Sequence, residues 1–82
     1  MSKQIELGIE KRNHGHWLKV SIPYTTNSVM TATVQSNTGE LLKSANLISG
    51  NNLIDIEAIS LQSVRVKIDT PFEIISKEIF LE

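Results

Sequence analysis

The residues best suited to chemistry in this chain are two histidines that lie close together, in His14-Gly15-His16-Trp17. On an extended chain, side chains two residues apart point to the same side, so both imidazoles could ligate one metal ion. Two ligands do not complete a site, the chain has no cysteine, and a third ligand such as Glu10 would have to be brought in by the fold. We favour the interpretation that Gly15 marks a turn, the histidines are solvated and Trp17 is half buried. We therefore predict no metal site and no cofactor.

Two aromatic residues offer a second kind of chemistry. Trp17 and Tyr24 lie near each other in the sequence, and such residues can form a stacking platform for a sugar. The chain has only four aromatic residues, and one buried aromatic side chain removes about 150–250 Å² from water. We therefore favour a core position for Trp17 and the two phenylalanines, and keep the ligand platform as the alternative.

No group of side chains predicts catalysis. The sequence contains no Gly-x-Ser-x-Gly elbow around a nucleophilic serine and no glycine-rich loop before a helix. Asp55 and Glu57 could pair for acid-base chemistry, but they alternate with Ile54 and Ile56, as the exposed side of a strand does. We predict that the protein is not an enzyme.

Length, charge and hydropathy indicate one ordinary domain. A chain of 82 residues has enough apolar residues for one core only, so residues 1–82 form a single predicted domain. Eight Lys and Arg residues stand against nine Asp and Glu, which leaves no basic excess for nucleic-acid binding. No apolar run is long enough for a signal peptide or a membrane span. The chain is then either cytoplasmic, if Met1 is the native start, or a mature part of a longer exported protein.

Alternation of apolar and polar residues predicts the elements that must position these groups. The expected strands cover residues 5–10, 18–22, 29–35, 41–47, 53–57, 64–68 and 72–81. Turn signals separate them, and Gly39 is expected to take the left-handed conformation that closes a hairpin through a bulge. The segment 57–63 fits either a single helical turn or an irregular connection.

Seven short strands without one helical period predict an all-β fold, an antiparallel seven-strand immunoglobulin-like β-sandwich. A β-barrel is the alternative. Both architectures bury one face of each strand.

The segment from Val29 to Leu81 resembles a known protein family in the order of its turns. In "VMTATVQSNTGELLKSANLISGNNLIDIEAISLQSVRVKI" a strand leads to a polar hairpin with glycine, "LLKS", a Gly-Asn turn, an "Asn-x-Ile-Asp" strand and a strand ending in "Val-Lys-Ile". The closing "IISKEIFL" is similar to the final strand of the same family. The family is the C-terminal sorting domain of the type IX secretion system, found on proteins that Bacteroidetes export. The matching residues are Gly39, Gly50, Asn52, Asp55, Ile59, Lys67 and Lys77.

The resemblance implies a folded address without catalysis. The secretion machinery would recognise the domain, and a longer parent protein would reach the medium or the cell surface at the outer membrane. The residues assigned to partner recognition are Gly39, Gly50, Asp55, Lys77 and Glu78. The competing hypotheses are an accessory module that binds carbohydrate or protein through Trp17 and Tyr24, and a structural spacer.

Lys77 and Glu78 interrupt the apolar alternation of the last expected strand, and two interpretations of them stay open. The strand could offer a free edge to which a partner adds its own strand. Alternatively, the two charges prevent such pairing.

Overall fold

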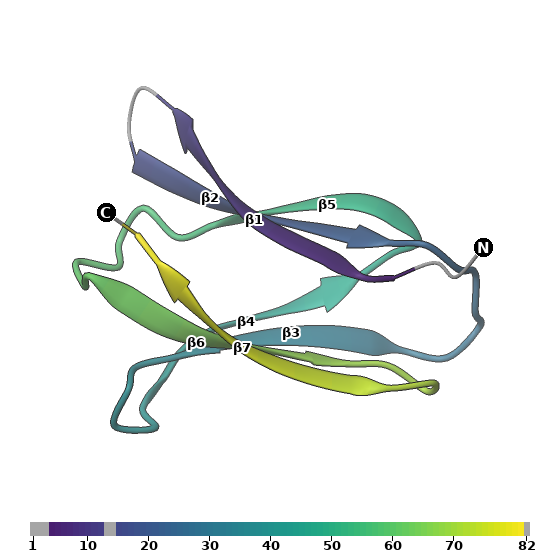
Figure 1. Ribbon diagram of the computed structural model, residues 1–82. Coiled ribbons are helices and arrows are strands. Elements are labelled where there is room, and N and C mark those ends of the chain that lie inside the picture. Colours follow the sequence, from purple (N-terminus) through teal and green to yellow (C-terminus); the bar gives the residue numbers. More distant parts are fainter. Residues whose placement is uncertain (1–3, 13–14, 82) are drawn as a thin grey trace.

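The computed structural model describes residues 4–12 and 15–81, and these fold into seven antiparallel strands (Figure 1). Period-two alternation marks most of these strands, as predicted, and β4 is an exception. The strands are β1 (Glu6–Arg12), β2 (Gly15–Ile22), β3 (Met30–Gln35), β4 (Leu41–Leu47), β5 (Gly50–Asp55), β6 (Ser63–Asp69) and β7 (Ile74–Phe80).

The strands form two sheets that face each other, so the fold is a β-sandwich and the barrel alternative is wrong (Figure 1). The three-stranded sheet has the order β1-β2-β5, and the four-stranded sheet has the order β4-β3-β6-β7. The fourth strand therefore pairs with the third, whereas in a constant-type immunoglobulin domain it lies in the opposite sheet beside the fifth strand.

The core lies between the two sheets and is built from one face of each strand. On β3, Met30, Ala32 and Val34 are buried while the residues between them are half exposed, as the alternation predicts. The buried apolar residues are Leu18, Val20, Ile22, Met30, Ala32, Val34, Leu47, Ile54, Ile56, Val64, Val66, Ile68, Ile79 and Leu81.

The aromatic residues occupy other places than expected. Trp17 is half buried, but it lies outside the core, and Phe72 and Phe80 are exposed. The preferred core position for Trp17 and both phenylalanines is therefore wrong. Aliphatic side chains fill the space between the sheets instead, and the buried residues are mostly Val, Ile and Leu.

The connections also refine the predicted elements. β4 has the predicted bounds, while β5 begins at Gly50, three residues earlier than expected. Gly39 has a φ of 94°, which confirms its expected left-handed conformation, but the β3–β4 register shift lies between Val34 and Gln35 and not at Gly39. After β5 the chain makes one turn, in which the Ile59 N–H donates to the Ile56 carbonyl oxygen over 3.1 Å.

All seven strands run along the long direction of the sandwich, which therefore has two distinct ends. At the Tyr24 end lie the β2–β3 loop 23–29, the β4–β5 turn and the β6–β7 turn, and β1 begins there (Figure 1). At the hairpin end lie the β3–β4 turn and the β5–β6 connection, and β7 ends there.

Candidate functional site

The five residues assigned to partner recognition do not converge on one site. Gly39 lies in the β3–β4 turn at the hairpin end, whereas Gly50 begins β5 at the Tyr24 end. Lys77 and Glu78 lie within β7, at an edge of the four-stranded sheet, and Asp55 ends β5 in the other sheet.

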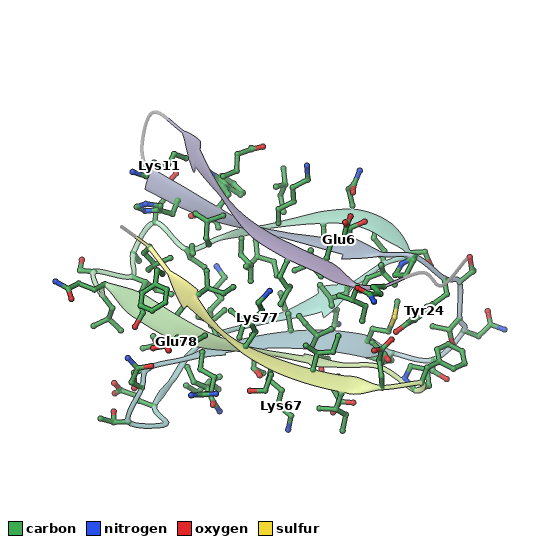
Figure 2. All side chains as sticks on the ribbon, viewed as in Figure 1. Glu6, Lys11, Tyr24, Lys67, Lys77 and Glu78 are labelled. Atoms are coloured by element: carbon green, nitrogen blue, oxygen red, sulfur yellow. The ribbon has the colours of Figure 1, made fainter. Side chains whose placement is uncertain are left out.

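Lys77 lies on the core-facing side of its strand. It pairs with Val66, which pairs with Val34, which pairs in turn with Lys43 on the opposite edge of the sheet. Directly paired residues project to the same face, so one row of this sheet consists of two fully buried valines with a lysine at each end. Figure 2 shows Lys77 on the side of β7 that faces the other sheet, whereas Lys67 points outward. An inward-pointing lysine on an edge strand opposes pairing with another chain, which favours the second interpretation of Lys77.

Glu78 takes part in a chain of polar contacts that joins three elements. The Asn37 amide donates to the Ser63 hydroxyl over 3.0 Å, and this hydroxyl donates to the Glu78 carboxylate over 3.2 Å. Ser63 is buried, so its hydroxyl needs such partners. The contacts fix the β3–β4 turn against β6 and β7.

Three further family-like residues, Gly50, Asn52 and Asp55, stabilise turns. Gly50 has a φ of 90°, a backbone conformation that glycine adopts without steric cost. Asn52 accepts a hydrogen bond from the Ile48 N–H over 2.9 Å, and its amide donates to the carbonyl oxygens of Ile48, Gly50 and Val20. At the end of β5, the Asp55 carboxylate accepts from the Glu57 N–H over 2.9 Å.

Trp17 and Tyr24 do not form a joint platform. Trp17 pairs with Glu10 on β1 and with Asp55 on β5. Its side chain lies on the outer face of the three-stranded sheet, away from the core. Tyr24 lies beyond the far end of the same strand, so about 20 Å of extended chain separates the two residues. Each would have to contact a ligand separately.

His16 is half buried, and its Nε2 is a buried atom without a hydrogen-bond partner among the described residues. The expectation that it is solvated is therefore wrong. His14, its predicted companion, lies outside the described residues. In residues 4–12 and 15–81, no three His, Asp or Glu side chains are grouped as a metal site would require.

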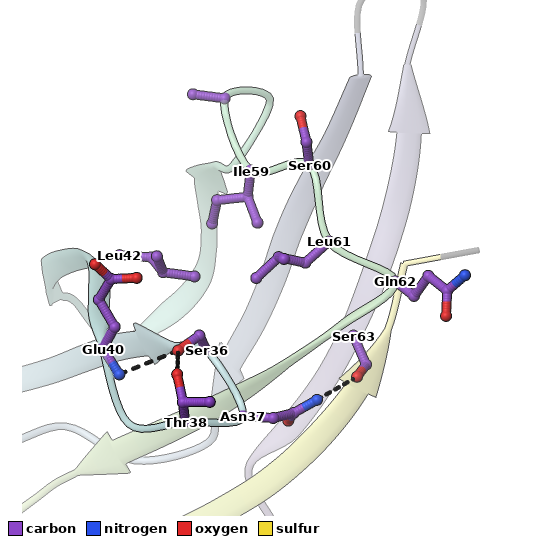
Figure 3. A pocket seen from close by; sticks show the side chains of 11 residues that line it. Ser36, Asn37, Thr38, Glu40, Leu42, Ile59, Ser60, Leu61, Gln62 and Ser63 are labelled. Atoms are coloured by element: carbon purple, nitrogen blue, oxygen red, sulfur yellow. Dashed lines mark hydrogen bonds between the residues drawn. The ribbon is translucent and has the colours of Figure 1, made fainter.

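A groove of about 820 Å³ lies at the hairpin end, between the β3–β4 turn and the β5–β6 connection. Leu42, Ile59 and Leu61 point toward one another across it (Figure 3). Its hydroxyl groups serve the turn itself, because the Ser36 Oγ lies 2.8 Å from the Thr38 Oγ1 and accepts from the Glu40 N–H over 3.1 Å. No sequence pattern predicts this groove, since it forms only when the two connections meet.

Tyr24 joins three connections at the opposite end, and we call its contacts the Tyr24 cluster. Its hydroxyl lies 3.0 Å from the Thr70 Oγ1 and donates to the Glu73 carboxylate over 3.2 Å. Its ring meets Phe72 edge to face at 4.8 Å between centroids. The Ser49 hydroxyl of the β4–β5 turn donates to the Tyr24 carbonyl oxygen over 2.7 Å.

Thr70 completes the cluster from the β6–β7 turn. It is buried, and its Oγ1 accepts from the Phe72 and Glu73 N–H groups over 3.2 and 3.0 Å. The turn that carries Phe72 is therefore held by its own threonine as well as by Tyr24.

Exposed apolar side chains gather around this cluster. Within the described part of the chain, eight large apolar side chains are exposed, and four of them lie at this end. We call these four the apolar end patch: Val29 (75% exposed), Ile48 (67%), Phe72 (64%) and Ile74 (62%). Val29 and Ile48 lie one step beyond the Met30–Leu47 pair, and Ile74 is in the last pair of the β6–β7 ladder. Sequence reasoning missed this surface.

In comparisons with known proteins, the chain matches no protein-family model, no curated protein and no solved structure. A search for helices that could span a membrane found none among the residues that the structure describes.

Proposed function

We propose that this domain is a non-catalytic sorting and attachment domain, similar in role to the C-terminal sorting domains of the type IX secretion system. It directs a longer parent protein across the outer membrane to the cell surface. Its partner is a protein of the secretion machinery.

The observation that carries the proposal is the way in which the family-like stretch 36–57 folds. It forms two exposed turns with an edge strand between them, and both glycines of the pattern, Gly39 and Gly50, need the positive φ that they adopt. Asn52 and Asp55 hold the same segment through side-chain hydrogen bonds to its backbone. The residues that resemble the family therefore have structural roles in this segment. This supports a backbone structure similar to that of the family.

A second observation that supports the proposal is the row Lys43–Val34–Val66–Lys77. A domain appended to other proteins has to stay soluble, without strand pairing to other chains, until it binds its receptor. Lysines at both edges of the four-stranded sheet oppose strand addition there.

Fusing residues 1–82 to a reporter with a signal peptide, in a bacterium that has type IX secretion, tests the proposal. We expect the reporter at the cell surface or in the medium. The controls are the reporter without the domain and the same fusion in a strain that lacks the type IX translocon. A reporter that stays in the periplasm contradicts the proposal.

A second candidate function is an accessory carbohydrate-binding module, and the outward position of Trp17 favours it. Trp17 is half buried on the outer face, between the strand positions of Glu10 and Asp55, and carboxylates beside an aromatic ring suit the hydroxyl groups of a sugar. A glycan array with the wild type and Trp17→Ala distinguishes the candidates. Loss of stability without any glycan signal eliminates this one.

A further inference from the structure

The apolar end patch is a surface without an assigned role, and one of its members is held by neighbouring groups. The Phe72 ring packs edge to face on Tyr24, and the Phe72 N–H donates to the Thr70 hydroxyl. A surface that is ordered before binding loses less conformational entropy when a partner docks, so more of the contact energy appears as affinity.

The patch carries little charge, and that charge is acidic. The three connections that form this end, residues 23–29, 47–51 and 70–74, contain a single charged residue, Glu73, and the exposed Asp69, which pairs with Ile74, adds a second carboxylate beside the patch. The Glu73 carboxylate accepts the Tyr24 hydroxyl. Anionic lipid and nucleic acid both require lysines or arginines, which these connections lack. The complementary partner surface is apolar and not acidic, because like charges that face each other oppose docking.

The exposed apolar area of the patch indicates whether its partner is a second copy of this chain or another protein. Four side chains of this size with these exposures present on the order of 400 Å² of apolar surface. A stable interface needs about 800 Å² from each partner, so two copies that meet end to end do not reach this area. A partner with a concave surface, which surrounds the end of the sandwich, gains additional area from the loops.

We infer that the apolar end patch docks into a concave, apolar surface of a protein in the export machinery. This inference rests on the proposed function, and it assigns recognition to the Tyr24 end instead of the β7 edge.

The test is the reporter export assay with a patch variant and a control variant that carry matched changes. The patch variant is Val29→Thr, Ile48→Thr, Phe72→Ser and Ile74→Thr. The control variant removes the other four exposed apolar side chains, through Leu41→Thr, Leu53→Thr, Leu61→Thr and Phe80→Ser. We expect the patch variant to lose about tenfold or more of the surface reporter, because a few residues carry most of the binding energy of an interface. We expect the control variant to be exported like the wild type.

The outcomes separate the two proposals. A wild-type fusion that stays in the periplasm overturns the proposed function and this inference with it. Equal export of the patch variant and the wild type overturns this inference alone, as does an equal loss in both variants. Urea unfolding of the purified variants checks folding. If the patch variant is unfolded, Val29→Thr with Ile48→Thr replaces it, since neither residue belongs to the Tyr24 cluster.

Two further measurements test the other occupants. In sedimentation equilibrium we expect the wild type to be monomeric, and a concentration-dependent dimer that the patch variant lacks would assign the patch to a second copy. In flotation with phosphatidylcholine and phosphatidylglycerol vesicles we expect no binding. Flotation of the wild type and not of the patch variant would assign the patch to lipid and overturn the inference.

Discussion

Individual polar side chains hold the connections of this sandwich in place. Among the residues that the structure describes, Tyr24 is the clearest example. Its hydroxyl, ring and carbonyl oxygen contact different connections, so one residue couples the β2–β3 loop to the β4–β5 and β6–β7 turns. Small domains bury a limited share of their surface, and such contacts are then a substantial part of their stability.

Tyr24→Phe should therefore destabilise the protein by about 1 kcal/mol, because it removes the hydroxyl and retains the ring contact with Phe72. The free energy of unfolding in urea is the measurement. Ser44→Ala, which removes an exposed hydroxyl, is the control and should be neutral. An unchanged midpoint for Tyr24→Phe would show that the Tyr24 hydroxyl contributes nothing to stability.

Gly39 and Gly50 have positive φ angles, which glycine adopts more easily than other residues. Gly39→Ala and Gly50→Ala should each cost about 1–2 kcal/mol, because a side chain at φ near 90° is strained even where space is open. Gly8→Ala is the matched control, since Gly8 lies in a strand without a positive φ and has open space around it. It should be neutral or slightly stabilising. Equal losses at all three glycines, measured by thermal unfolding, would refute the argument.

The two edge strands of the four-stranded sheet share one feature. On β4 and β7 a lysine occupies a core-facing position beside a buried valine. We expect Lys43→Val with Lys77→Val to make the protein self-associate, because the row becomes apolar from edge to edge.

Size-exclusion chromatography with light scattering measures this association. The control is Lys19→Val with Lys67→Val, which removes the same charge from exposed, outward-facing positions. Association of both double variants to the same degree would attribute the effect to net charge alone.

Most of the strands could be predicted from the sequence, because period-two alternation is a local signal. Leu18 to Ile22 is one example, because its alternation predicts the last five residues of β2. The bounds of β4 also agree with expectation, although its sequence does not alternate, because turn residues flank it. The start of β5 was missed because Gly50 and Asn51 are turn residues that nevertheless pair with Ile22 and Ser21. Only the neighbouring strand decides such a position.

The surfaces were harder to predict than the strands. Phe80 has the opposite parity to Ile79 and Leu81, which are buried, so parity within β7 was a usable signal for its exposure. The apolar end patch had no such signal, because Val29, Ile48 and Phe72 come from three connections that meet only in the folded protein. The Lys43–Lys77 row likewise depends on strand order, and sequence alone does not supply that order.

For the molecule as a whole, stability depends on one small aliphatic core. The buried residues are mostly Val, Ile and Leu, with no aromatic ring among them in the described part of the chain. Ile68→Ala should cost about 2–5 kcal/mol through lost burial and the cavity it leaves, which approaches the total stability of a domain this small.

Urea unfolding of Ile68→Ala and of the matched variant Ile48→Ala checks this prediction. Ile48 is mostly exposed, so its loss should change the free energy of unfolding by less than about 0.5 kcal/mol. Similar losses for both isoleucines would contradict the position of the core between the sheets.

The direction of the strands also has a mechanical consequence. β1 begins at the Tyr24 end and β7 finishes at the hairpin end, and the two strands belong to different sheets. A pulling force applied between Glu6 and Phe80 then acts nearly parallel to the β1–β2 and β6–β7 ladders, each with seven residue pairs. The hydrogen bonds of a ladder loaded in this way share the force and break together, whereas a ladder that is peeled from one end loses them one by one. A domain built in this manner resists tension along its axis, which suits an anchor that holds a protein at a cell surface.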